Sequence, residues 1–556
     1  MKIKISNLHL SPKDNITYDD LILKELKVGK DKVKNITLVS QSIDARKKDN
    51  IFYVLSFIVE GDFDSRVLKN KHVTKYESAP LRMKYTSFND NLRPVIVGFG
   101  PAGIFAALYL TRCNAKPIIL ERGGSMDERI ASVNEFLKNK KLDSNSNIQF
   151  GEGGAGTFSD GKLQTNAHDS LISYILNEFV RYGAPKNIIY ESMPHIGTDN
   201  LRNVIKNMRL DMEQRGASFY FNTKLNEIAF EDDGVLAITS SMAFKTRHLI
   251  LGLGHSARDT FKMLYKHDVK MEPKSFSMGV RIEHKREFIN QMQYGNFFTY
   301  LPAASYKSAV HLPTGRSLYT FCMCPGGEVM ASSSEEKAIV TNGMSYYNRD
   351  KENSNAALLV NVEPRDFYKS SPLDGLDFQE YYERQAFNLA NDYRAPANLM
   401  KEFIEGDVAK NIRSVKPSYP HGVILASFKG ILPDYVIDTL KEGLILMDKK
   451  LHGFYHPDAV LTGIESRSSC PLRILRDEMG ISSKYLYPIG EGAGYAGGIT
   501  TAALDGLKCA MKIVGDYKKN NIEIFIKKAN ISEIAQKEKI STKLSDCFFH
   551  KIPSNF

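Results

Sequence analysis

The sequence predicts an α/β fold built around a Rossmann-type domain, with an inserted α+β domain and a small α+β module at the N-terminus. Two observations lead to this prediction. An apolar run at 95–97 is followed by a glycine-rich turn, an apolar helical stretch and a second apolar run at 117–120, the order of a βαβ unit. A second glycine-rich block lies far along the chain, at 487–498. One domain is therefore expected to be assembled from two distant segments.

Residues 1–90 are expected to form the N-terminal module and a linker. Apolar residues recur there with the periods of strands and of a helix. The predicted elements are strands at 3–10, 36–43 and 51–59, and a helix at 18–26. This pattern is typical of a small α+β unit, such as a ferredoxin-like one. Residues 69–91 are polar with little periodicity, so they are expected to be the linker.

The remaining chain divides by composition and periodicity. The first part of the Rossmann-type domain is expected at 91–267 and its return segment at 445–515, because both contain the glycine-rich blocks and helical stretches that follow them. The segment 268–444 is rich in predicted strands and aromatic residues, and is expected to be the inserted domain. The tail at 516–556 alternates lysine, asparagine and apolar residues and is expected to be a peripheral helix or partly disordered.

The turn after the first apolar run has the spacing G-x-G-x-x-G. It consists of Gly98, Gly100, Pro101, Ala102 and Gly103. Such glycines permit a tight turn, close approach of the backbone to a pyrophosphate, and close packing of helix on strand. The pyrophosphate lies at the helix N-terminus, where free N–H groups favour an anion. Glu121, followed by Arg122, ends the second strand at the offset of a carboxylate that binds ribose hydroxyls. The sequence therefore predicts a dinucleotide site, and the acid argues against a 2′-phosphate.

Composition restricts the class of protein. The chain has 556 residues, 42% of them hydrophobic and 25% charged, so bulk disorder is not expected. The net charge of +10 is spread along the chain, which favours solvated faces over a nucleic-acid footprint, although it favours anionic ligands. Six cysteines in a chain of this length do not indicate a disulfide framework. Without a signal-peptide core or an 18-residue apolar run, a cytoplasmic protein with no membrane span is expected.

Five further blocks strengthen the nucleotide-site prediction. They lie at 42–48, 147–163, 249–259, 321–327 and 463–469. Together with the two glycine-rich blocks, this set resembles a family of bacterial FAD-dependent dehydrogenases of largely uncharacterised substrate, within the glutathione-reductase-like flavoprotein superfamily. The resemblance covers nearly the whole chain to about residue 515. It implies an FAD-binding Rossmann domain with an inserted substrate domain.

The resemblance also implies which residues hold FAD. The first glycine-rich turn would cradle the pyrophosphate, Glu121 would hold the adenosine ribose, and the backbone of Leu225 would meet the adenine. The residues that would lie along the pyrophosphate and the edge of the flavin are Gly153, Gly154, Thr157, Lys162 and Leu163. Gly252 and Gly254 would occupy the strand-end motif of these flavoproteins.

The second glycine-rich block would complete this site. Gly490 and Glu491 match the Gly-Asp motif whose acid binds the ribityl chain, although glutamate is one methylene longer. Gly497, Gly498 and Ile499 would begin a helix whose N-terminus faces flavin N1 and O2, where its dipole stabilises the anionic reduced flavin.

Catalytic residues are harder to choose. Arg281 and Arg467 are candidates for clamping a carboxylate or phosphate, and ion pairs with Glu283 or Glu465 are an equally good interpretation. His284 and His255 are candidate general acids or bases.

Two further motifs allow more than one interpretation. Cys322 and Cys324 are interpreted as packing residues rather than a redox dithiol or metal ligands, because C-x-C is an awkward spacing for a disulfide and no further ligands are evident; no metal is expected. The block at 252–257 could be a second dinucleotide turn, but no full βαβ unit follows it. Any NAD(P)H would therefore bind transiently.

The predicted function is that of an FAD-dependent oxidoreductase, a dehydrogenase or reductase, that transfers hydride between the flavin and an unidentified small molecule. The arginines and the positive net charge favour the hypothesis of an anionic metabolite. A flavin monooxygenase is the alternative among enzymes. An FAD-carrying RNA-binding or regulatory protein is the alternative from another class, but sparse aromatics among the basic residues of the N-terminal module weigh against nucleic acid. The sequence does not indicate the oligomeric state.

Overall fold

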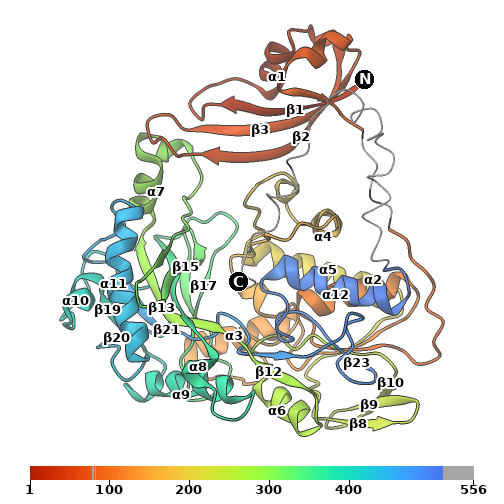
Figure 1. The fold of residues 1–556 in the computed structure, drawn as a ribbon, viewed down its shortest axis with the longest axis vertical. Coiled ribbons are helices and arrows are strands. Elements are labelled where there is room, and N and C mark those ends of the chain that lie inside the picture. The colour runs from red at the N-terminus through yellow and green to blue at the C-terminus, as the bar shows by residue number, and fades with distance from the viewer. Residues whose placement is uncertain (78–80, 82, 518–556) are drawn as a thin grey trace, which may run out of the picture.

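The computed structural model describes residues 1–77, 81 and 83–517. Three parts are visible in Figure 1: an N-terminal sheet at the top, a large mixed sheet at the left, and a sheet covered by helices at the lower right. Apart from its first two residues, the predicted tail at 516–556 lies outside the described residues.

The five-stranded parallel sheet joins the two distant glycine-rich segments. Its strand order is β23-β11-β5-β6-β7. The bounds are β5 (Val95–Val97), β6 (Ile118–Leu120), β7 (Ser218–Tyr220), β11 (Leu249–Leu251) and β23 (Leu486–Pro488). All neighbours pair in parallel. Because β23 pairs with β11, the return segment completes the sheet that the first segment begins, as predicted.

Helices cover one face of this sheet, and a small sheet and a helix cover the other. The first group is α2 (Pro101–Arg112), α3 (Met126–Asn139), α4 (Leu171–Arg181), α5 (Thr198–Gln214) and α12 (Ile499–Ile513). The second group is α6 (Arg258–Lys266) and the antiparallel strands β8 (Glu227–Glu231), β9 (Gly234–Ile238) and β10 (Ala243–Thr246). Separate apolar cores lie on the two faces, as expected for a parallel sheet buried on both sides.

Helices α2 and α12 lie side by side (Figure 1) and approach closely at one glycine. A Cβ atom on Gly506 of α12 would lie 2.0 Å from the Ala102 carbonyl oxygen of α2. A Cβ atom on Gly103 would lie 2.0 Å from the Gly98 carbonyl oxygen. Both glycines are therefore required by close backbone packing, which brings the N-termini of the two helices to the same edge of the sheet.

The inserted domain is built on a seven-stranded sheet of order β14-β15-β18-β13-β21-β19-β20. Its strands are β13 (Phe276–Lys285), β14 (Ala309–His311), β15 (Ser317–Cys324), β18 (Asn353–Val362), β19 (Ala395–Leu399), β20 (Val423–Leu425) and β21 (Val460–Glu465). Besides α11, which is described below, this part contains the helices α7 (Arg286–Tyr294), α8 (Pro364–Phe367), α9 (Asp374–Asn388) and α10 (Met400–Glu405). Short two-stranded sheets flank it, β12 (Met271–Pro273) with β22 (Leu472–Ile474) and β16 (Glu328–Ala331) with β17 (Thr341–Met344).

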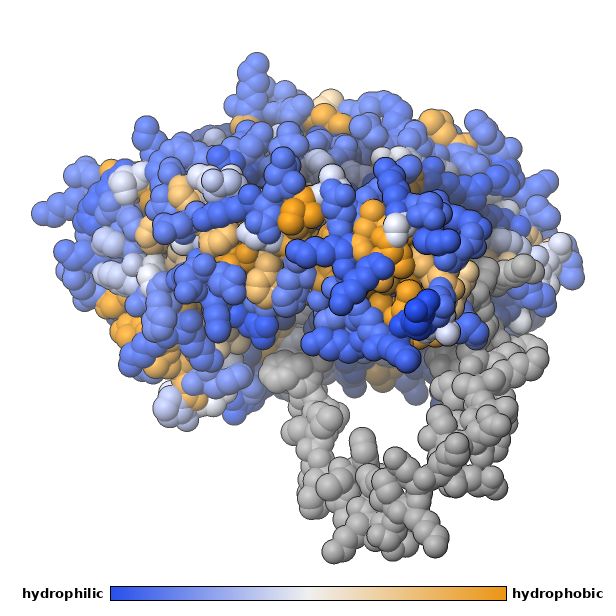
Figure 2. All heavy atoms as spheres, turned by 90° about the horizontal axis from the view of Figure 1, so that it is seen from above, coloured by the Kyte–Doolittle hydropathy of each residue, from blue (hydrophilic) through white to orange (hydrophobic). Residues whose placement is uncertain are grey.

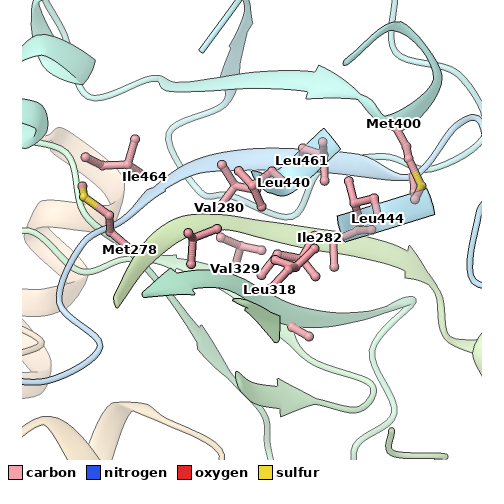
Figure 3. Close-up of a cluster of buried hydrophobic side chains, with 14 of the residues drawn as sticks. Met278, Val280, Ile282, Leu318, Val329, Met400, Leu440, Leu444, Leu461 and Ile464 are labelled. Atoms are coloured by element: carbon pink, nitrogen blue, oxygen red, sulfur yellow. The ribbon is translucent and has the colours of Figure 1, made fainter. Parts of the chain in front are cut away.

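A long helix, α11 (Asp434–Lys450), packs on the seven-stranded sheet. Figure 3 shows Leu440 and Leu444 of this helix beside Val280, Ile282 and Leu461 of β13 and β21. The return to the five-stranded sheet was expected near residue 445. In the structure, β21 is an inner strand of the seven-stranded sheet, so the chain returns only after Glu465. The predicted boundary therefore falls inside α11, a helix that packs on the seven-stranded sheet.

The N-terminal module has the strand order β2-β3-β1-β4. Its elements are β1 (Lys2–Leu10), α1 (Tyr18–Leu26), β2 (Val33–Asp44), β3 (Phe52–Gly61), a 3₁₀ helix (Ser65–Lys69) and β4 (Val73–Lys75). All pairs are antiparallel. This is the element order of a ferredoxin-like unit with the second helix shortened to a 3₁₀ turn. The start of the predicted linker therefore belongs to the module.

The face seen from above the N-terminal module is mainly hydrophilic, with small apolar groups scattered on it (Figure 2). Within the part of the chain that the structure describes, no helix has both the length and the apolar character needed to cross a membrane.

Replacing Gly506 by valine is expected to lower the free energy of unfolding by about 2 kcal/mol or more, because the new side chain must displace the α2 backbone. Denaturant unfolding measures this change. Lys508→Val places the same side chain two residues further along the same helix, at a partly exposed ion pair with Asp169, and should cost about 1 kcal/mol at most. Equal effects of the two substitutions would contradict the close approach.

Candidate functional site

The first glycine-rich turn lies at the carboxyl end of β5. Gly98 has φ of +92°, and a Cβ atom there would lie 2.3 Å from the Gly252 carbonyl oxygen. Gly100 is the N-cap of α2, Pro101 is its first residue, and no side chain caps this helix end. A Cβ atom on Gly100 would meet only the Gly154 Cα, at 3.7 Å. The helix therefore presents uncapped N–H groups beside the glycine-dense loop at 147–163. This is the arrangement that binds a phosphate.

The loop at 147–163 folds around a side chain that the sequence analysis missed. Arg129 of α3 is fully buried. It donates to the carbonyl oxygens of Asn147, Ile148, Gly151, Glu152 and Gly154 and to Thr157 Oγ1, at 2.7–3.3 Å. Burial lowers the pKa of Arg129 to about 9, so the guanidinium remains charged at neutral pH. The guanidinium of Arg129 therefore fixes the path of the loop that was predicted to lie along the pyrophosphate.

A signal for Arg129 is present in the sequence. Met126, Arg129, Val133 and Phe136 are the buried residues of α3 and follow one another at helical spacing. A cation in the middle of an apolar helix face must find acceptors inside the protein, and a glycine-dense loop offers free carbonyl groups.

The carboxylate of Glu121 has a different set of partners from the one predicted. It accepts hydrogen bonds from the backbone N–H groups of Phe99 (2.8 Å), Gly123 (3.0 Å) and Gly151 (2.9 Å). Glu121 therefore ties the first turn to the glycine loop, and contact with a ribose stays a prediction.

A polar cavity of about 390 Å³ lies beside this strand end. It is lined by Arg122, Asp143, Asn145, Asn222, Lys224, Asn226 and Ser240. Arg122 is held by Asp259 at 2.9 and 3.0 Å, and Leu225, between two lining residues, is buried. The cavity thus lies where the adenosine end of the cofactor was predicted.

The second glycine-rich block is fixed to the same site by hydrogen bonds that sequence reasoning also missed. The N–H of Gly490 donates to Asp505 Oδ2 at 2.7 Å, and Arg476 makes a bidentate ion pair with Asp505. A Cβ atom on Gly492 would lie 2.4 Å from the Gly254 carbonyl oxygen. The closing block is therefore packed directly on the strand-end motif.

The N-terminus of α12 also lies open beside the glycine loop. Gly498 is its N-cap, without a side-chain cap, and Cβ atoms on Gly254, Gly497 or Gly498 would meet nothing within 4 Å. Thr500 Oγ1 donates to the Leu163 carbonyl oxygen at 2.7 Å. Ile499 side-chain atoms would lie 3.2 Å from a Cβ atom on Gly156. Two uncapped helix ends and open backbone thus meet at one sheet edge, and these residues fit a dinucleotide cofactor.

Ionisable groups gather between this edge and the seven-stranded sheet. Burial raises the pKa of Glu491 to about 7, Lys274 opposes the rise, and Cys322 adds to it. Lys162 is half-buried, lies 3.7 Å from Asp160 and contacts the Met323 carbonyl oxygen. Its pKa is raised, since neighbouring negative groups outweigh burial.

The predicted catalytic arginines are both in closed ion pairs. Arg281 is fully buried and bidentate to Glu465, at 2.6 and 3.1 Å. Arg467 contacts Glu383 at 2.7 and 2.9 Å, and Arg258 contacts the same carboxylate. The ion-pair interpretation, which named Glu283 or Glu465, is met for Arg281. Arg467 is also in an ion pair, but with Glu383, which was not foreseen. A substrate contact stays a prediction for both arginines.

The two histidines differ in position. His284 is the second-last residue of β13, which continues directly into α7. Its Nε2 lies 3.0 Å from the Phe454 carbonyl oxygen, and burial lowers its pKa to about 4. His255 follows the open Gly254. Burial, with repulsion from Arg467 and Arg258, lowers its pKa to about 3, so both histidines are neutral at pH 7.

Among the residues described, no three His, Cys, Asp or Glu side chains are arranged to hold a metal ion.

Comparison with known proteins gives the family. An uncharacterized protein of Clostridium beijerinckii is 44% identical over 529 residues, 93% of this chain and 99% of its own length. A family model described as "FAD-dependent protein, C-terminal domain-like" matches residues 275–468. The chain belongs to the same family as this Clostridium protein, and its residues 275–468 belong to a family of FAD-dependent proteins. FAD is its cofactor. A second model, described as a domain of unknown function, matches residues 2–60 of this FAD-dependent protein.

Solved structures show weaker similarity to this FAD-dependent protein. The halogenase PltM in complex with phloroglucinol and FAD is 12% identical, with 77% of this chain and 70% of that chain covered and a TM-score of 0.34. CtdE in complex with FAD is 11% identical, with coverages of 79% and 91% and a TM-score of 0.31. The OxyS anhydrotetracycline hydroxylase from Streptomyces rimosus is 11% identical, with coverages of 78% and 64% and a TM-score of 0.31. Scores this low do not assign an activity.

Replacing Arg129 by methionine is expected to cost about 3 kcal/mol of stability and to weaken FAD retention, because buried carbonyl groups lose their donors. Thermal unfolding and flavin content measure the two effects. Arg202→Met is the matched control. Arg202 lies over the same Phe158 ring as Arg129, but its hydrogen bond to the Thr157 carbonyl oxygen is long, 3.4 Å. If the control lost as much as Arg129→Met, the loop-organising role would be wrong.

Glu491 predicts a pH dependence of stability in the protein without flavin. Its folded pKa of about 7 exceeds the ordinary value of 4.5, so the folded state binds the proton more tightly. The contribution of Glu491 to the free energy of unfolding is fully present below the ordinary pKa of the carboxyl group, and it is lost as pH rises through about 7. Unfolding midpoints across this range should fall less steeply in Glu491→Gln than in wild type. Asp62→Asn, at an exposed carboxylate, should leave the slope unchanged, and a wild-type slope in Glu491→Gln would refute the assignment.

Proposed function

We propose that this chain is an FAD-dependent oxidoreductase that transfers hydride between the flavin and an unidentified small molecule. The observation that carries the proposal is the meeting of three glycine-rich segments at the uncapped N-termini of α2 and α12. This edge faces the seven-stranded sheet, so a flavin held there would have the inserted domain as its second wall. When bound, FAD supplies the hydride acceptor or donor, and the protein supplies position and electrostatics.

The residues of the chain would divide this work. Backbone N–H groups at the start of α2 would bind the pyrophosphate, and Arg129 would hold the glycine loop in the shape that leaves them free. Backbone N–H groups at the start of α12 would stabilise negative charge on the reduced flavin. The neutral His255, beside the open Gly254, is the better placed of the two histidines for proton transfer.

The proposed substrate is a small anion. Since Arg281 and Arg467 are already paired with carboxylates, positive charge at the site would come from Lys162 and Lys274. The net charge of +10 adds a long-range attraction. NAD(P)H would act as a transient partner rather than a resident one.

Gly497 offers a test of cofactor placement that leaves the fold intact. A Cβ atom there meets nothing within 4 Å, so Gly497→Leu should fold normally. Its side chain would fill the space in front of α12, and FAD binding should weaken about ten-fold or more, a loss of about 1.4 kcal/mol or more. Fluorescence titration with FAD measures this. Gly497→Ala, which adds only a Cβ atom in open space, is the control and should bind nearly as wild type. Normal binding by Gly497→Leu would place the flavin elsewhere.

The reaction class is tested on the FAD-loaded protein. Anaerobic reduction followed by rapid mixing with oxygen should return oxidised flavin without a persistent flavin hydroperoxide band. A persistent band would replace the dehydrogenase proposal with a monooxygenase. Absence of a flavin absorbance band after purification, together with no uptake of added FAD, would overturn the proposal as a whole.

A further inference from the structure

The segment Cys322-Met323-Cys324 forms an irregular end to β15. Its pairing with β18 shifts register between Phe321 and Cys324, and Cys322 has φ of +40°, a conformation that non-glycine residues rarely adopt. Two cations hold this bulge. Arg281 Nη1 donates to the Cys322 carbonyl oxygen at 2.9 Å, and Lys162 Nζ donates to the Met323 carbonyl oxygen. A strained bulge fixed in this way is a common feature of functional sites.

The two thiols have different environments. Cys322 is half-buried and Cys324 is fully buried. Cys324 Sγ donates a hydrogen bond to the Cys322 carbonyl oxygen at 3.3 Å. Hydrogen bonding between the two thiols, with Lys162 and Arg281 nearby, holds the pKa of Cys322 well below its usual range. The same hydrogen bonding between the thiols and burial raise the pKa of Cys324. By contrast, burial raises the pKa of Cys113, Cys470 and Cys509 to about 12. Low pKa, nearby cations and partial exposure together are the environment of a reactive cysteine.

The bulge lies beside both glycine-rich walls of the FAD site. Lys162, which holds the Met323 carbonyl, precedes Leu163, which accepts a hydrogen bond from Thr500 in the first turn of α12. On the other side, Cys322 is near enough to Glu491 for its charge to raise the pKa of that carboxyl group. The thiols are therefore presented by the inserted domain to the edge where the flavin is proposed to lie.

In place of the packing role that their C-x-C spacing led us to expect, we propose that Cys322 and Cys324 form a redox-active dithiol that exchanges an electron pair with the flavin. In the oxidative direction the Cys322 thiolate and the Cys324 thiol form a sulfur–sulfur bond, and the Cys324 proton is released. The two electrons and one proton convert FAD to its anionic two-electron-reduced form, so charge and atoms balance. Cys322 is the accessible sulfur and Cys324 the internal partner. The electron exchange rests on the proposed function, whereas the thiol reactivity does not.

Alkylation of the full-length chain without added flavin tests the thiol chemistry alone. Iodoacetamide labelling over a pH series, followed by peptide mass spectrometry, should show Cys322 reacting about ten-fold or more faster than Cys113 and Cys509 at pH of about 6. The rate of Cys322 alkylation should reach its plateau below neutral pH, because the thiol is then already ionised. In Lys162→Met the plateau should move to higher pH. Labelling of Cys322 no faster than Cys509, or a rate that rises only above pH of about 8, would overturn the proposal.

Electron uptake by the FAD-loaded protein tests the couple. After mild oxidation and removal of the oxidant, anaerobic dithionite titration should consume about two electron pairs per flavin, one for flavin and one for the disulfide. Cys322→Ser and Cys324→Ser should each consume about one, and Cys113→Ala, at a buried thiol at the far end of α2, should behave as wild type. Uptake of about one pair by wild type would refute the dithiol couple. Failure to bind FAD would instead refute the proposed function and leave the alkylation result standing.

Discussion

The buried guanidinium of Arg129 is the contact on which the cofactor site depends. A glycine-dense loop has few side chains of its own to fix its path, and its carbonyl groups point inward. Each buried carbonyl without a donor would be costly, and a single planar guanidinium supplies several donors in fixed directions. Lysine, with a compact ammonium group, could not span the same set of carbonyls. The position of Gly153 and Gly154 against the start of α2 therefore follows from one side chain on α3.

Much of the cofactor domain was predictable because several of its glycines are required by close local contacts that leave no room for a Cβ atom. Gly98 and Gly103 stand where any Cβ atom would strike a carbonyl oxygen, and such positions appear in sequence as a fixed spacing. The same spacing predicted that α2 begins at the turn, and the structure begins it at Pro101. The distant block at 487–498 was expected in the same domain, and β23 pairs with β11 beside the first turn.

Other features were not predictable, because they depend on contacts between residues far apart. Arg467 and Glu383 are 84 residues apart in sequence, and nothing in the local pattern around Arg467 indicates that Glu383 is its partner. The boundary near residue 445 was misplaced for a related reason. Helix α11 is apolar enough to cover either sheet, and only the pairing of β21 with β13 shows which one it covers. The roles of Arg129 and Asp505 required knowledge of the loops that they contact.

Between the two large sheets, one carboxylate links charged groups from both domains. Glu383 of α9 accepts from Arg258 of α6 and from Arg467, which follows β21. The pKa of Glu383 is held far below its usual value, because two guanidinium groups outweigh its burial. Removing one partner of such a network leaves a buried charge uncompensated, which costs more than a surface ion pair. This triad therefore resists relative movement of the domains. A second link between the same two domains is the contact of Lys162, in the glycine loop, with the Met323 carbonyl oxygen of the Cys322 bulge.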